Sequence, residues 1–159
     1  MPGTMTLREI TAENEPRVRM LAVAPDQEMF VRSVSRSLED AAANPLSEPW
    51  YRAIYVDDDP VGFVMMSFDV PPGRPSRPWR YYLWRFLIDE RYQCRGYGRA
   101  AIELVIDIVG ASPGGTDLYT SVHAGDGGPL PFYRSLGFEP TGEWFDDEQV
   151  LRLVIGRAP

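Results

Sequence analysis

Apolar residues along the chain follow two patterns, one typical of helices and one typical of buried strands. The clearest helical pattern begins at Tyr97, where apolar residues recur every three or four positions: Ala101, Ile102, Val105, Ile106 and Val109. Gly110 and Pro113 follow this stripe and are expected to end the helix. Two further helices are expected earlier, one over residues 11–22 and one that opens at Asp26.

Strands are expected where aromatic and β-branched residues form continuous runs. Residues 50–56 and 61–68 have this composition, and the acidic turn between them predicts a hairpin. Residues 79–89 form a longer apolar and aromatic run, which is typical of a central strand covered on both faces. Shorter elements complete the pattern: a strand at 6–10, a strand at 117–124, a short helix at 129–137 and a terminal hairpin at 142–155.

Four prolines and a glycine fill residues 70–78, so this segment is expected to be a loop. Two interpretations are open for it. A stiff surface connection is favoured, because loops are the variable parts of most folds. The alternative is that the loop borders a ligand.

Length and composition fit a single soluble domain over residues 1–159. The hydrophobic content of 44% is sufficient for a real core, and no apolar run reaches the roughly 18 residues that span a bilayer. The N-terminus lacks the layout of a secretory signal, so a cytoplasmic protein without a membrane partner is expected. The net charge of −7 argues against a nucleic-acid partner, because such proteins usually present a basic face.

The cysteine and histidine counts exclude several kinds of site. Cys94 is the sole cysteine, so the chain forms no internal disulfide, and His123 is the sole histidine. A Cys/His zinc cluster is therefore absent, and no metal is expected. A Ser-His-Asp triad has little support either.

The junction between the run at 79–89 and the helix at Tyr97 carries two glycines and three arginines in the sequence RYQCRGYGRA. A helix N-terminus leaves unpaired N–H groups and a partial positive charge, so this junction predicts an anion site. Two alternatives remain. Gly96 and Gly98 could serve only the turn, or with Ala101 and Asp117 they could form a dinucleotide-binding fingerprint. The antiparallel hairpin before them and the short remaining chain disfavour that fingerprint.

Residues 93–98, read as Gln-Cys-Arg-Gly-Tyr-Gly, resemble the Gln/Arg-x-x-Gly-x-Gly/Ala loop of the GNAT acetyltransferases. The segment FYRSLGF at 132–138 is similar to the tyrosine-bearing helix and Gly-Phe step of that family. Within it, the chain is most similar to bacterial spermine/spermidine acetyltransferases. The resemblance implies an α+β (α/β) GNAT-like fold, in which a mixed sheet of six to seven strands is splayed in its middle and flanked by about four helices.

The resemblance also implies where acetyl-CoA, the co-substrate, would bind. The backbone of Leu87 and Ile88 would pair with the pantetheine arm, and the loop would cradle the pyrophosphate with its amides, which is consistent with the physics of anion binding at helix N-termini. The loop residues implied are Gln93, Cys94, Arg95, Gly96, Tyr97, Gly98 and Arg99. Two residues depart from the family pattern: Cys94 stands where glycine is frequent, and Asp126 where asparagine is frequent.

The same resemblance assigns Tyr133 as the general acid that protonates the sulfur of coenzyme A; its alternative role is core packing. Glu28 is the candidate proton acceptor for the amine, although a glutamate at a helix N-terminus also has a purely structural explanation. A covalent route through Cys94 is disfavoured, because its expected place is beside the pyrophosphate. His123 is expected to be a packed or surface residue.

Three aromatic residues are candidates for contact with the aliphatic part of the amine. Trp84, Trp50 and Tyr51 could form an apolar or cation–π wall, although aromatic residues on strands are mostly core.

These features lead to one functional prediction and two alternatives. The chain is expected to be an N-acetyltransferase that moves an acetyl group from acetyl-CoA to a primary amine by direct transfer in a ternary complex. The acceptor would be a small cationic molecule, either polyamine-like or an aminated antibiotic. The alternatives are a non-catalytic acyl-CoA-binding module and a protein N-terminal or lysine acetyltransferase. A homodimer is the expected assembly, by the same resemblance.

Overall fold

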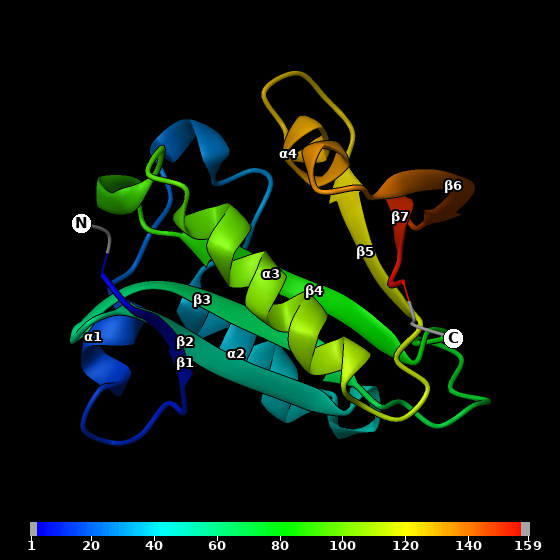
Figure 1. Ribbon diagram of the computed structural model, residues 1–159, viewed down its shortest axis with the longest axis horizontal. Coiled ribbons are helices and arrows are strands. Elements are labelled where there is room, and N and C mark those ends of the chain that lie inside the picture. The colour runs from blue at the N-terminus through cyan, green and yellow to red at the C-terminus, as the bar shows by residue number, and fades with distance from the viewer. Residues whose placement is uncertain (1–2, 157–159) are drawn as a thin grey trace.

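The strands form one mixed sheet in the order β1-β2-β3-β4-β5-β7-β6 (Figure 1). The computed structural model describes residues 3–156. The strands are β1 Met5–Arg8, β2 Pro49–Val56, β3 Asp59–Phe68, β4 Tyr81–Ile88, β5 Asp117–His123, β6 Glu139–Phe145 and β7 Glu148–Val154. The helices are α1 Glu15–Arg19, α2 Val34–Ala43, α3 Tyr97–Gly110 and α4 Leu130–Ser135. None of the helices in the described part of the chain has the length and apolar character that crossing a bilayer requires.

The sheet opens between β4 and β5. Strands β1 to β4 are antiparallel neighbours, whereas β4 and β5 are parallel and pair at just two positions, Tyr82 with Tyr119 and Leu83 with Thr120. Beyond Leu83 the two strands diverge, which Figure 1 shows as the gap between the green and the yellow strand. The second half of β4, from Trp84 onward, therefore has no strand partner on its β5 side.

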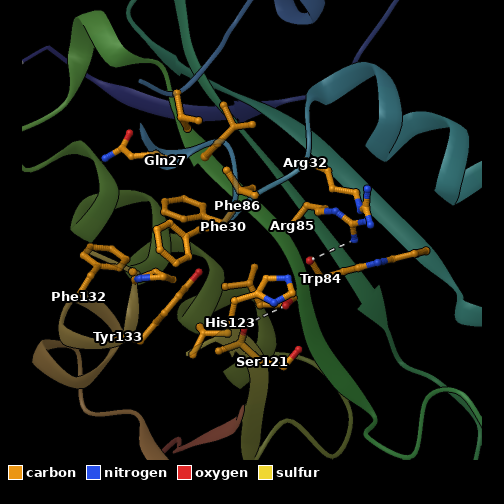
Figure 2. Close-up of a pocket in the computed structure, with 18 of the residues that line it drawn as sticks. Gln27, Phe30, Arg32, Trp84, Arg85, Phe86, Ser121, His123, Phe132 and Tyr133 are labelled. Atoms are coloured by element: carbon orange, nitrogen blue, oxygen red, sulfur yellow. Dashed lines mark hydrogen bonds between the residues drawn. The ribbon is translucent and has the colours of Figure 1, made fainter. Parts of the chain in front are cut away.

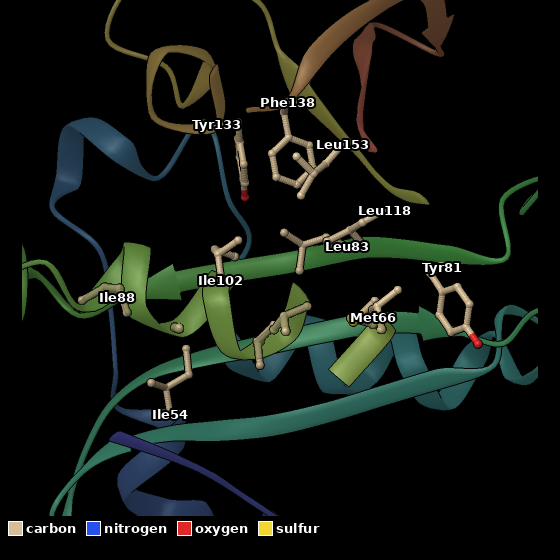
Figure 3. Close-up of a cluster of buried hydrophobic side chains, with 14 of the residues drawn as sticks. Ile54, Met66, Tyr81, Leu83, Ile88, Ile102, Leu118, Tyr133, Phe138 and Leu153 are labelled. Carbon is tan, nitrogen blue, oxygen red and sulfur yellow. The ribbon is translucent and has the colours of Figure 1, made fainter. Parts of the chain in front are cut away.

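Two hydrophobic clusters cover opposite faces of the sheet. The larger lies under α3, where Ala101, Ile102 and Val105 pack on β2 to β5 and reach Phe138 (Figure 3). The smaller lies under α1 and α2 and is centred on Val18 and Val34. Because both faces of β3 and β4 are covered, these strands are apolar on both sides, which explains their continuous apolar runs.

The predicted fold class is confirmed: residues 3–156 form seven strands in a mixed, splayed sheet with four α-helices. The helix at Tyr97 begins and ends where the apolar stripe predicts. The dinucleotide-binding alternative is excluded, because a doubly wound sheet is parallel and here β4 and β5 are the one parallel pair among the described strands.

The expected helix opening at Asp26 is wrong. Pro25–Gln27 form one 3-10 turn, and α2 begins only at Val34. Ser33 is its N-cap, because the Ser33 hydroxyl accepts a hydrogen bond from the Arg36 amide at 3.1 Å. The first helix is also shorter than expected, at Glu15–Arg19 instead of 11–22. Glu28 consequently lies in a turn and gains nothing from a helix N-terminus.

Candidate functional site

A cavity of about 1280 Å³ occupies the opening between β4 and β5. The second half of β4 forms one wall, and β5 with α4 forms another (Figure 2). The loop that leads into α3, together with Gln27, closes the cavity at the Ile88 end of β4. From Gln27 the chain borders the cavity as far as Arg32, which lies beside Arg85 (Figure 2). The turn between β6 and β7 borders it at the Tyr82 end. The site is therefore an elongated one that runs along β4.

Six consecutive backbone N–H groups, from Cys94 to Arg99, have no hydrogen-bond acceptor within residues 3–156. Gly96 is in the left-handed region at φ +83°, and a Cβ built on it would meet nothing within 4 Å. Cys94 has φ +62°, where a non-glycine residue is strained, so the frequent glycine of the family pattern has a physical reason. Successive amides of this kind at a helix N-terminus form a concave anion site.

Two residues hold this loop in place. Asp89, which is 3% exposed, accepts hydrogen bonds from the amides of Ala22 and Arg91 and from the Arg91 side chain at 2.8–2.9 Å. Burial alone would raise the pKa of Asp89, but these hydrogen bonds together lower it. Gln93 donates through Nε2 to Gln27 Oε1 and to the Ile88 carbonyl, both at 2.9 Å. Gln93 thus fastens the loop to β4.

The other predicted cofactor residues gather around this loop. Leu87 and Ile88 end β4 and line the cavity, together with Cys94, Gly96, Tyr97, Gly98 and Arg99. The Arg99 guanidinium donates to the Ser135 carbonyl and hydroxyl at 3.2 Å. Arg95 lies outside the cavity lining, and its Nη2 donates to the Arg91 carbonyl at 3.2 Å. Asp126 is exposed and does not line the cavity either.

Tyr133 lies on α4 and is 6% exposed. Its ring packs edge-on against Phe132 and Phe138, with ring centroids 5.2 and 5.4 Å away, so it does contribute to the core. Its hydroxyl end is directed into the cavity (Figure 2). Burial penalises the phenolate and raises the pKa of Tyr133 well above its usual value, so the hydroxyl remains a proton donor at neutral pH.

Glu28 is exposed and lies at the margin of the cavity that the Gln27–Arg32 segment forms. Of the three aromatic residues expected to form a wall, Trp84 lines the cavity. Trp50 stacks on Phe68 and Tyr51 stacks on Phe63, and neither lines it. The structure therefore separates Trp84 from the other two.

An acidic group around His123 was missed by sequence reasoning. His123 lines the cavity at the end of β5, with Asp147 and Glu148 each 3.7 Å from one of its ring nitrogens. Ser121 donates to Glu148 at 2.8 Å and contacts the Tyr82 hydroxyl at 2.5 Å. His123, Asp147 and Glu148 each have a nitrogen or carboxylate oxygen that could bind a metal ion, and these atoms lie within 4.8 Å of one another. Within residues 3–156 this is the one group of three or more such side chains. Only the folded hairpin turn brings Asp147 and Glu148 to β5, so no local sequence signal marks this group.

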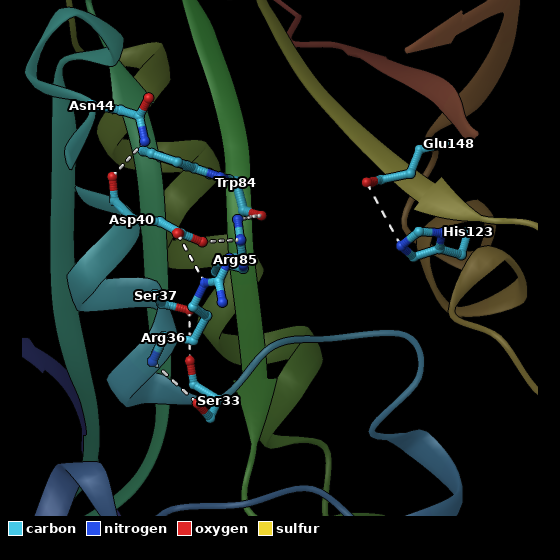
Figure 4. A network of polar contacts seen from close by, with 9 residues as sticks. All are labelled: Ser33, Arg36, Ser37, Asp40, Asn44, Trp84, Arg85, His123 and Glu148. Atoms are coloured by element: carbon cyan, nitrogen blue, oxygen red, sulfur yellow. Dashed lines mark hydrogen bonds and ion pairs between the residues drawn. The ribbon is translucent and has the colours of Figure 1, made fainter. Parts of the chain in front are cut away.

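Arginines occupy the facing wall (Figure 4). Arg85 on β4 donates to Asp40 on α2 at 2.7 Å, and Asp40 also accepts from Arg36 at 3.1 Å. Arg77, in the Pro-rich loop, is 7% exposed and lines the cavity. The favoured interpretation of residues 70–78 as a mere surface connection is therefore wrong at Arg77, because folding turns this side chain inward onto β4. One acidic and one basic wall thus meet at the Tyr82 end.

Comparisons with known proteins agree with this architecture. The model of the acetyltransferase (GNAT) family matches residues 4–138. A spermine/spermidine N(1)-acetyltransferase of Bacillus subtilis strain 168 is 27% identical over 149 residues, which are 93% of this chain and 97% of the relative. An acetyltransferase structure from Thermus thermophilus has a TM-score of 0.71 at 21% identity, covering 97% of this chain and 99% of that one. A PaiA N-acetyltransferase from Thermoplasma acidophilum, in complex with coenzyme A, has a TM-score of 0.65 at 12% identity, covering 95% and 99%.

Proposed function

Because the chain belongs to the GNAT family of acetyltransferases, we propose that it moves the acetyl group of acetyl-CoA directly to a primary amine of a small cationic acceptor in a ternary complex. Membership makes it an acetyl-CoA-dependent N-acetyltransferase. The observation that carries the proposal is the opening between β4 and β5, with unpaired amides at one end and a buried tyrosine facing its interior.

Acetyl-CoA fits this opening as the co-substrate. The amides from Cys94 to Arg99 offer successive donors to the pyrophosphate without a single essential side chain. The unpaired edge of β4 up to Leu87 and Ile88 offers backbone groups to the pantetheine amides in the manner of an added strand. Gly98 allows the start of α3 to lie close to Phe132 of α4, because a Cβ at position 98 would lie only 3.3 Å from the Phe132 ring.

The transfer begins with a neutral amine, because the nitrogen needs a free lone pair to attack the thioester. The amine nitrogen forms a bond to the thioester carbon while the carbon–sulfur bond breaks. Tyr133 gives its hydroxyl proton to the departing sulfur and recovers one from solvent, and the nitrogen loses a proton to a carboxylate, directly or through water. The products are the N-acetylated amine and coenzyme A as its thiol.

Two carboxylates compete for the role of proton acceptor. Glu28 is the residue expected from sequence, and it lies exposed at the cavity margin. Glu148 is less exposed, and its carboxylate contacts both Ser121 and His123 inside the cavity. Glu148 therefore suits both roles that the acceptor side needs, since a carboxylate attracts the ammonium ion and can accept its proton.

We expect Glu148→Gln to lower kcat/KM for an amine acceptor by roughly 10- to 100-fold, because the amide can neither attract the cation nor take its proton. Glu28→Gln, measured in parallel, should cause the smaller loss. Steady-state kinetics of thiol release would decide between them. A larger loss for Glu28→Gln would return the role to that residue.

The acceptor class rests on the acidic wall and on relatives. Asp146, Asp147 and Glu148 border the Tyr82 end of the cavity, where an ammonium group would be attracted. The Bacillus relative is named for spermine and spermidine, which makes polyamines the first acceptors to test, followed by aminated antibiotics.

The proposal is tested by thiol release from acetyl-CoA with a panel of polyamines, diamino acids, aminoglycosides and peptides. Turnover with a small amine is the expected result. Acetyl-CoA binding without thiol release for any acceptor would favour a non-catalytic binding module instead. Turnover with peptides alone would favour a protein acetyltransferase.

A further inference from the structure

The basic wall of the cavity contains a buried arginine that lacks a carboxylate partner. Arg77 donates through Nε to Ser67 at 2.9 Å and through Nη1 to the Ser76 carbonyl at 3.0 Å. It makes no salt bridge within residues 3–156, and its Nη2 makes no hydrogen bond there. Every fully buried side-chain nitrogen and oxygen of the described residues has a hydrogen-bond partner. Because Nη2 of Arg77 has none, it is not fully buried and is accessible to solvent. Arg77 is also one of the residues that line the cavity.

The position of Arg77 is fixed by aromatic rings. Its guanidinium lies 4.6 Å from the ring centre of Tyr82 and 4.5 Å from that of Trp84, both on β4. The ring centre of Phe145, on β6, lies 5.8 Å from it. A guanidinium stacked on aromatic rings has a restricted orientation, and its positive charge with the free Nη2 suits a charge-assisted hydrogen bond to a carboxylate.

The surrounding charge also favours an anion. Arg32, Arg36 and Arg85 line the same side of the cavity, and Asp40 is the carboxylate that serves both Arg36 and Arg85. Arg32 has no salt bridge within the described residues. Burial lowers the pKa of Arg77 because it penalises the charged form, and an anionic ligand would offset that cost.

The basic and the acidic wall are only one side chain apart. Tyr82 carries Arg77 on its ring face, while its hydroxyl contacts Ser121, which in turn donates to Glu148. A ligand that meets both walls is therefore small, with an anion and an ammonium group separated by about the length of a tyrosine side chain. A polyamine alone would leave Arg77 and Arg32 without a salt bridge and would place its own cations beside them, with Glu148 as the nearest negative charge acting on Arg77.

We propose that the wall around Arg77 is a carboxylate-binding subsite, and that the acceptor is a small amine that also carries a carboxylate, as a diamino acid does. The proposal rests on the amine acetyl transfer argued above and narrows its acceptor class. A diamino acid is still cationic overall, because it has two ammonium groups and one carboxylate. Its carboxylate would lie on Arg77, and its amine would lie near Glu148 and His123.

The test uses two matched pairs of amines that differ by one carboxylate: ornithine with putrescine, and lysine with cadaverine. In the pair whose amines are turned over faster, we expect the wild-type protein to have a kcat/KM at least about 10-fold higher for the amino acid than for the diamine. The reason is that only the amino acid has a carboxylate to make a charge-assisted contact with Arg77. In Arg77→Met this ratio should fall at least about 10-fold, and Arg77→Lys should retain part of it. Arg52→Met is the matched control, because Arg52 also stacks on a tryptophan, at 4.5 Å from Trp50, but lies outside the cavity lining.

Calorimetric binding of ornithine and of putrescine to the wild-type protein saturated with coenzyme A provides a readout that does not depend on folding of a variant. Tighter binding of ornithine supports the subsite, even if no amine is turned over and the proposed enzymatic function fails. Equal or better binding and turnover of putrescine would overturn the subsite while leaving amine acetylation intact. A ratio that Arg77→Met leaves unchanged would also overturn it.

Discussion

Tyr133→Phe is expected to reduce turnover by roughly 10- to 10⁴-fold while the KM for acetyl-CoA changes little. The substitution removes only the hydroxyl, and the ring keeps its edge-on contacts with Phe132 and Phe138, so the fold should be retained. Without the phenol, the sulfur must leave as a thiolate or take its proton from water. Single-turnover kinetics with saturating acetyl-CoA and amine would measure the chemical step directly.

Tyr81→Phe is the control for this experiment. Tyr81 is also a buried tyrosine with a raised pKa, but its hydroxyl donates to the Pro113 carbonyl at 2.6 Å, outside the cavity lining. Turnover of Tyr81→Phe should equal that of the wild type.

Burial raises the pKa of Tyr133, so its hydroxyl keeps its proton through neutral and alkaline pH to beyond about 10. Loss of the Tyr133 proton should therefore not lower wild-type turnover in that range. Unchanged turnover in Tyr133→Phe would remove its role as the acid.

Gly96→Val is expected to weaken acetyl-CoA binding by roughly 5- to 140-fold. At φ +83° a β-branched residue costs about 1–3 kcal/mol, so the free loop would relax to another conformation and its amides would no longer converge. Restoring the cradle on binding would then cost that strain, and 1.4 kcal/mol corresponds to about a factor of ten in affinity. Calorimetric titration with acetyl-CoA measures the change.

Gly142→Val is the matched control, because Gly142 has φ +88° and a Cβ there would also meet nothing within 4 Å. It lies on β6, away from the cavity lining. The backbone strain is therefore similar, but the acetyl-CoA dissociation constant should equal that of the wild type. Similar losses in both variants would mean that general destabilisation, and not the cradle, accounts for the effect.

The central part of the fold was predictable because its signals are local. The apolar run before the glycines, the two glycines themselves and the apolar stripe after Tyr97 together specify β4, the loop and α3. The predicted helix start at Asp26 is wrong because Asp26 has the residue type of a helix start without capping one, whereas the cap of α2 in the structure is Ser33. Residues 25–27 form a 3-10 turn, and Gln27 accepts a hydrogen bond from Gln93, which is distant in the sequence.

The acceptor half of the site was not predictable, because it depends on long-range contacts. Glu148 reaches His123 only through the pairing of β5 with β7, and Arg77 turns inward only because its guanidinium packs on Tyr82 and Trp84. Glutamate and arginine lie mostly on protein surfaces, so neither residue stands out when the sequence is considered alone. The cofactor half, in contrast, depends on contiguous backbone amides and could be placed from the glycines at 96 and 98.

A crystal structure of the protein with coenzyme A is the most direct test of the proposed binding mode. The pyrophosphate is expected on the amides from Cys94 to Arg99, the pantetheine arm along β4 between Trp84 and Ile88, and the sulfur beside the Tyr133 hydroxyl. Coenzyme A bound at another surface, with the opening between β4 and β5 left empty, would contradict that binding mode.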